Sequence, residues 1–119
     1  MEPGDTFLGG GEVLGEDHLW LVINNPPAHA GVALIVNVST LRPNAETTCL
    51  VQKGEHPFIQ HDSYVRYGSA RSANVADLEK LVKAGRRKPH QAASRVLLEK
   101  VRAGATASPL LARELLALL

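Results

Sequence analysis

Short apolar segments separated by proline, glycine and asparagine make up most of the first two thirds of the chain. Such segments, each roughly four to eight residues long and bounded by turn-forming residues, are typical of β-strands. The pattern predicts five strands, at residues 5–8, 18–23, 32–38, 47–52 and 64–67. The segment 32–38 is apolar on both faces except at Asn37, which indicates a strand in the middle of a sheet or of a closed barrel.

The spacing of the apolar residues changes after residue 74. From there they recur at intervals of about three and four residues, which is the spacing of one face of an α-helix. A helix is predicted over 75–84, because Gly85 is a suitable residue to end it. A second helix is predicted over 92–103. Ser108-Pro109 is a typical start for a third, since serine caps a helix and proline fits its first turn.

Length and composition indicate a single globular domain over 1–119, with strands over 1–73 and helices over 74–119. The 45% of apolar and 21% of charged residues are typical of a protein with a packed core and not of a disordered chain. The formal net charge of +1 gives no general attraction to nucleic acid. The basic residues within 83–88 form a local cluster, but a solvated helix end explains them at least as well.

The single cysteine and the apolar runs restrict the location of the protein. Cys49 has no partner for an intramolecular disulfide, and its apolar surroundings predict a small core side chain. The first residues lack a basic region followed by an apolar run, so we expect no signal peptide. The apolar runs are too short to span a bilayer. We therefore expect a cytoplasmic protein without a membrane partner.

The segment 54–67 is the richest in chemically versatile side chains. It contains His56 and His61, then Asp62, and ends in a predicted strand with Tyr64 and Arg66. Loops that hold several polar groups on a rigid scaffold are common places for catalysis or recognition. Each residue also has a structural explanation. His56 can brace the turn before proline, Asp62 can cap a loop, and Tyr64 can be a half-buried sheet residue.

Four short motifs, in this order and spacing, resemble the MazF/PemK/Kid toxin family. They are Gly4-Asp5-Thr6-Phe7, His18 to Asn24, Leu34 to Thr40, and Asp62 to Val65 leading to Ala70-Arg71. The resemblance covers about residues 4–85. It implies a small SH3-like β-barrel followed by C-terminal helices, usually as a homodimer, that cleaves single-stranded RNA without metal. It also implies a small acidic antitoxin as a partner and no cofactor.

The two catalytic positions of the toxin motifs carry different residues in this chain. In the toxins an arginine-proline pair precedes the second strand and the arginine is catalytic, whereas His18 stands at that place here. The family's catalytic threonine falls on Ser39, with Thr40 next to it. The segment 56–61 is also absent from the toxin motif. The resemblance therefore implies a divergent branch that keeps the hydroxyl and lacks the permanent cation.

RNA cleavage through the 2′-hydroxyl requires a base, an acid and positive charge near the phosphate. Imidazoles can act as both base and acid near neutral pH. We expect the catalytic residues to meet at one rim of the barrel: His18, Ser39, Thr40, His61 and Arg71. The predicted RNA contacts are His56, Asp62, Tyr64 and Arg66.

Two other functions are compatible with the same residues. A non-catalytic SH3-like module would bind protein or nucleic acid, and the missing arginine is what loss of catalysis would produce. A metal-dependent hydrolase would need a ligand set such as His56, His61 and Asp62. Their spacing matches no common metal motif, so no metal site is predicted.

Overall fold

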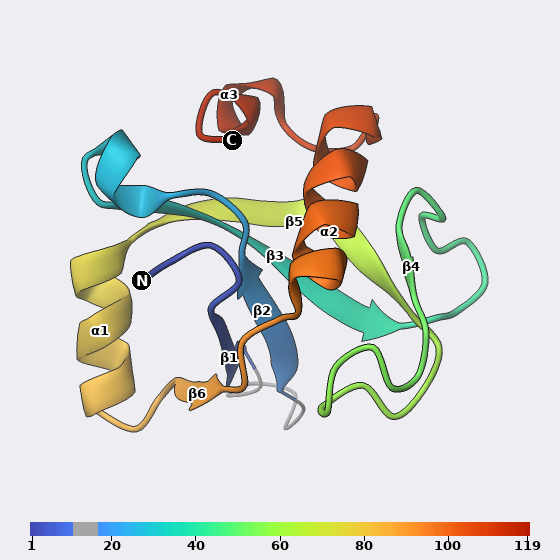
Figure 1. Cartoon of the computed structure of the whole chain (residues 1–119), viewed down its shortest axis with the longest axis horizontal. Helices are drawn as coiled ribbons and strands as arrows, with labels where there is room; N and C mark the ends of the chain where they lie inside the picture. The colour runs from blue at the N-terminus through green and yellow to red at the C-terminus, as the bar shows by residue number, and fades with distance from the viewer. Residues whose placement is uncertain (11–16) are drawn as a thin grey trace.

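A computed structural model describes residues 1–10 and 17–119, which form one curled antiparallel sheet with helices on both of its faces (Figure 1). The strands are β1 (Thr6–Gly9), β2 (His18–Val22), β3 (Val32–Thr40), β4 (Leu50–Val51), β5 (Ser63–Asn74) and β6 (Lys88–His90). The helices are η1 (Pro26–His29, a 3₁₀ turn), α1 (Val75–Lys83), α2 (Arg95–Ala107) and α3 (Arg113–Leu116). The strand order in the sheet is β4-β5-β3-β2-β1-β6.

The observed sheet confirms the predicted fold class, a small barrel-like β-structure followed by C-terminal helices. The sheet curls into a half-barrel, with β4 at one edge and β6 at the other. β6 differs from the expectation, because it lies within the predicted helical part and pairs with β1. The division at residue 73 therefore separates the sheet from the helices only in part.

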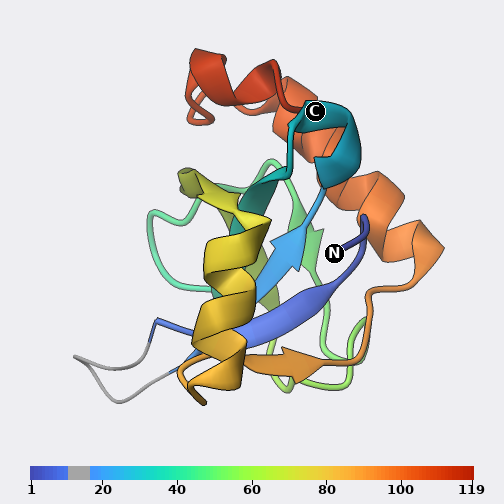
Figure 2. The ribbon, with the colours of Figure 1, turned by 90° about the vertical axis from the view of Figure 1, so that its left-hand side faces the viewer.

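The two faces of the sheet carry different apolar clusters, because successive strand residues point to opposite sides. On one face Leu21, Val36 and Val65 pack under α2, which contributes Val101 and Ala105. The other face has a smaller cluster. It consists of Phe7, Trp20, Val22, Ala33 and Ile35, with Leu78 of α1 packed against them. Figure 2 shows α1 and α2 on opposite sides of the strands.

β5 is longer than predicted and is irregular in its middle. β3 pairs Ile35 with Arg71 and Asn37 with Arg66, so β5 advances five residues while β3 advances two. The extra residues form a bulge, and β5 then continues to Asn74. The polar sequence after Tyr67 has no apolar alternation, which is why the strand was expected to end there.

Helix α2 lies very close to β5 at Gly104. The Tyr67 hydroxyl donates a hydrogen bond to the Val101 carbonyl oxygen at 2.8 Å. Cys49 is buried beside this contact, as expected for a core residue. Burial is the main cause that raises the pKa of its thiol, so the cysteine is held in its unreactive form.

Most of the C-terminal leucines pack against the core of their own chain. Leu111 is buried, and Leu115, Leu118 and Leu119 pack against the cluster under α2. Leu110 remains 56% exposed. The third helix begins at Arg113, later than Ser108-Pro109 predicts. Among the described residues, no helix has both the length and the apolar character needed to cross a bilayer.

Candidate functional site

The two positions that the resemblance assigns to catalysis, His18 and Ser39, lie side by side. Leu19 of β2 pairs with Val38 of β3, so His18, one residue earlier, comes opposite Ser39. Ser39 in turn pairs with Tyr64 of β5. Paired residues in an antiparallel sheet point to the same side. His18, Ser39 and Tyr64 therefore form one row across the end of the sheet.

The next row on this face adds charge and an aromatic ring. Trp20 pairs with Asn37, and Asn37 pairs with Arg66. Arg71, farther along β5, places its guanidinium carbon 5.1 Å from the centre of the Trp20 ring. This distance is within the range of a cation–π interaction. We call these residues together the arginine face: His18, Trp20, Asn37, Ser39, Tyr64, Arg66 and Arg71.

The interactions within the arginine face leave its two guanidinium groups available. Ser39 donates a hydrogen bond to Asn37 Oδ1 at 3.3 Å, and Trp20 Nε1 donates to the Gly9 carbonyl oxygen at 3.3 Å. Arg71 is exposed and Arg66 is half-buried. Within residues 1–10 and 17–119, neither arginine forms an ion pair. A surface with unpaired guanidinium groups beside an aromatic ring is suited to a phosphate-bearing ligand.

Tyr64, Trp20 and Asn37 form the buried base of the arginine face. Tyr64 is only 3% exposed, so its ring supports the sheet and is not open to stack on a base. Trp20 and Asn37 were not among the residues predicted to have a function. The alternation that begins at His18 places Trp20 on the same face, and this signal was present in the sequence.

Thr40, His61 and Asp62 lie at the same end of the sheet but outside the arginine face. Thr40 follows Ser39 in the strand and therefore points to the opposite side. Asp62 is exposed, and its Oδ1 accepts a hydrogen bond from the Lys53 amide at 3.2 Å. His61 is exposed, and its carbonyl oxygen accepts a bond from the Ser63 hydroxyl at 2.7 Å. Within residues 1–10 and 17–119, the side chains of His61 and Thr40 form no hydrogen bond or ion pair.

His56 is placed differently from the predicted RNA contact. It is 2% exposed, and its Nε2 lies 2.6 Å from the Gln91 carbonyl oxygen. Its Nδ1 accepts a hydrogen bond from the Phe58 amide at 3.1 Å, so the ring is neutral with the proton on Nε2. Burial is the main cause that lowers its pKa; the bond to Gln91 opposes this and His90 adds to it. Both ring nitrogens are thus used inside the fold.

The alternative function, a metal-dependent hydrolase, requires a group of side chains that can bind a metal ion. In the part of the chain that the structure describes, no three side chains among His, Cys, Asp and Glu are grouped so that they could hold a metal ion. His56 is engaged within the loop, and Asp62 binds the backbone of Lys53.

A scan of the sequence against known protein families gives no match. A search of curated protein sequences gives no match either.

Proposed function

We propose that this chain is a cytoplasmic, MazF/PemK-like protein that binds single-stranded RNA on the arginine face and cleaves it without a metal ion. The observation that carries the proposal is the register that places His18 beside Ser39, with Arg66 and Arg71 on the same face. Two arginines next to a half-buried imidazole provide both phosphate recognition and a proton acceptor.

Binding depends on the guanidinium groups. Arg71 is held over Trp20, so its orientation is restricted before the ligand arrives. A restricted side chain loses less entropy when it binds a phosphate. Arg66 is on the neighbouring row and can contact the same phosphate or the next one along the strand.

The cleavage step uses the histidines at the end of the sheet. His18 takes the proton of the 2′-hydroxyl, and the 2′-oxygen attacks the adjacent phosphorus. The bond between phosphorus and the 5′-oxygen breaks, and His61 donates a proton to that oxygen. The products are a 2′,3′-cyclic phosphate and a 5′-hydroxyl. The arginines stabilise the negative charge on the pentacoordinate phosphorus.

Incubation of the purified protein with end-labelled single-stranded RNA in EDTA tests the proposal. We expect cleavage, with a cyclic phosphate detected by mass spectrometry. His18→Ala should lower the rate by about 10²- to 10⁴-fold, the usual contribution of a general base. Intact RNA with the wild-type protein, or an unchanged rate in His18→Ala, would contradict the nuclease.

A non-catalytic RNA-binding module is the second candidate. It is favoured by the hydrogen bond that Ser39 makes to Asn37, because this bond occupies the hydroxyl that catalysis would need. Fluorescence anisotropy with a labelled oligonucleotide separates the two. Binding that weakens in Arg66→Ala and Arg71→Ala, without cleavage, would establish the module. Arg95→Ala is the control, since Arg95 is exposed on α2, which covers the opposite face.

The toxin function also includes partners. We propose a homodimer and a small acidic antitoxin whose carboxylates neutralise the arginine face. Light scattering of the purified protein, and co-purification with the product of the neighbouring gene, test these two assignments.

A further inference from the structure

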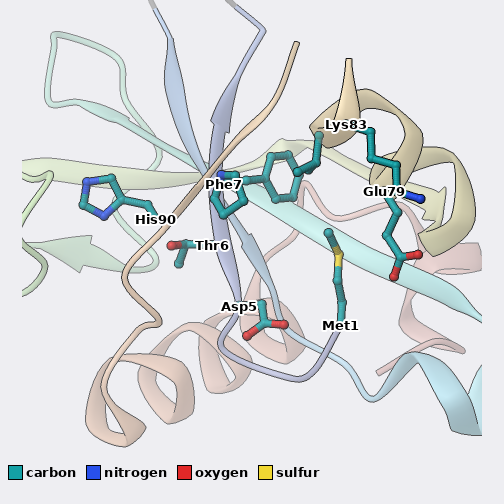
Figure 3. Close-up of a pocket in the computed structure, with 9 residues that line it drawn as sticks. Met1, Asp5, Thr6, Phe7, Glu79, Lys83 and His90 are labelled. Atoms are coloured by element: carbon teal, nitrogen blue, oxygen red, sulfur yellow. The ribbon is translucent and has the colours of Figure 1, made fainter. Parts of the chain in front are cut away.

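A cavity of about 420 Å³ lies between α1 and the edge of the sheet formed by β1 and β6. Figure 3 shows Phe7 in its middle, with His90 on one side and the α1 residues Glu79 and Lys83 on the other. Met1 and Asp5 close the remaining side. The volume is within the range of small-molecule sites, roughly 300–1,000 Å³.

The cavity combines an apolar interior with carboxylates from two different elements. Phe7, Val82 and Pro89 supply the apolar surface. Asp5 precedes β1, and its Oδ2 is fixed by a hydrogen bond from the Glu2 amide at 2.8 Å. Glu79 projects from α1 and forms no ion pair within the described part of the chain. A flat ring that carries N–H donors at its edge fits these walls.

The cavity is on the same face of the sheet as the arginine face. Phe7 pairs with Trp20, the residue on which Arg71 stacks. Arg87 lies against the next residue of β1 on this face: a Cβ at Gly9 would overlap its Cδ and come within 2.7 Å of its Nε. The guanidinium group of Arg87 thus lies beside Gly9, and Lys83 stands at the cavity wall.

We propose that this cavity holds one unstacked base of the bound RNA, and that the base is one with an exocyclic amino group, guanine in particular. The N1–H and N2–H groups of guanine donate together to a carboxylate, whereas uracil presents carbonyl oxygens that a carboxylate repels. The ring packs against Val82 and Pro89, with the buried Phe7 beneath it, and the ammonium of Lys83 binds a flanking phosphate. The inference rests on the proposed function, since it identifies a specificity subsite for the same RNA.

Titration of the protein with mononucleotides, followed by amide NMR, tests the subsite without requiring cleavage. We expect GMP to shift the amides of Phe7, Glu79 and Lys83 and to bind at least tenfold more tightly than UMP, because one bidentate contact discriminates by about this factor or more. Glu79→Gln should remove most of this preference. Glu99→Gln, an exposed carboxylate on α2, should leave it unchanged.

Several outcomes would overturn the subsite. They are equal binding of GMP and UMP, shifts confined to the arginine face, no shift at about 1 mM nucleotide, or an unchanged preference in Glu79→Gln. Val82→Phe, which fills the cavity from α1, should abolish the shifts while the fold is retained by circular dichroism. Persistent GMP binding in that variant also contradicts the site. If GMP binds as expected but RNA is not cleaved, the subsite stands and the nuclease fails.

Discussion

At Gly104, the absence of a side chain decides how closely a helix approaches the sheet. A Cβ there would overlap the Tyr67 hydroxyl, come within 2.9 Å of its Cζ and lie 3.0 Å from Cys49 Cβ. Glycine costs about 1 kcal/mol relative to alanine inside a helix, yet the position is buried and closely packed. Close packing therefore outweighs helix propensity at this residue.

We predict that Gly104→Ala destabilises the protein by about 1–3 kcal/mol, because the overlap moves α2 away from β5 and weakens the bond from Tyr67 to Val101. Urea unfolding followed by circular dichroism measures the change. In a Tyr67→Phe background the same substitution should cost less, since the overlapping hydroxyl is absent. An equal cost in both backgrounds would contradict this explanation.

His56 predicts a pH dependence of stability. Its pKa in the folded protein is lowered by burial, so the unfolded chain binds more protons than the folded one at mildly acidic pH. The free energy of unfolding should then be highest above the unfolded pKa of about 6.5 and fall as the pH decreases toward the folded value. Unfolding measured from pH 7.5 to 5 in wild type and His56→Gln tests this.

The variant should show a smaller loss of stability over this pH range, because glutamine does not titrate. His29→Gln serves as the control, since His29 lies in the last turn of η1, away from the ring cluster of His56. A pH profile that is the same in wild type and His56→Gln would mean that other groups cause the acid sensitivity.

At the scale of single elements, the short edge strand β4 depends on a side chain from α2. Lys100 Nζ donates to the Leu50 carbonyl oxygen at 2.7 Å and to Glu55 at 2.8 Å. Burial acts to raise the pKa of Glu55, but the bonds from Lys100 and the Gln52 amide outweigh it and lower the pKa. Lysine at an exposed edge also hinders pairing with another chain.

We predict that Lys100→Met lowers stability by only about 0.5–1 kcal/mol, because the ion pair is partly exposed and screened by water. The effect on local opening of β4 should be larger than the effect on global stability. The Val65 amide, which donates to the Cys49 carbonyl oxygen at 3.0 Å, should exchange faster with solvent as β4 loosens. Arg95→Met, which breaks a more exposed pair on α2, should change neither quantity.

The elements that sequence patterns predicted well are those with strong apolar repeats. β2 and β3 alternate or run continuously with apolar residues, and α1 has an apolar residue every three or four positions. β6 was missed because Lys88-Pro89-His90 carries no strand pattern, and its pairing with β1 is a tertiary effect. α3 was misplaced because Ser108 caps a bend: its hydroxyl accepts from the Leu110 amide.

For the molecule as a whole, the candidate site was predictable where it follows from neighbouring strands. The order of the motifs placed His18 at the start of one strand and Ser39 near the end of the next. Antiparallel pairing of these two strands then brings the two residues opposite each other. The burial of His56 could not be predicted, because it depends on contact with residue 91, which lies 35 positions away. The proximity of Arg71 to Trp20 likewise depends on the bulge in β5.

The affinity for RNA should depend on salt through the arginine face. Each phosphate contact releases counterions, so the slope of log K against log salt changes by about 0.7 per contact on a single strand. We predict that Arg71→Ala and Arg66→Ala each reduce the slope by about this amount. Anisotropy titrations at several salt concentrations measure it. A slope that is identical in wild type and both variants would place the phosphates elsewhere.

The bulge in β5 decides on which side of the sheet its positive charge appears. In a regular strand, positions an odd number of residues apart face opposite ways, so Arg66 and Arg71 would be separated by the sheet. In the bulge, however, these five steps of β5 lie opposite only two steps of β3. Arg66 and Arg71 therefore lie on the same face, the one that carries Trp20 and Asn37. Without the bulge, Arg71 would point toward the apolar cluster beneath α2, and the arginine face would hold one guanidinium group instead of two.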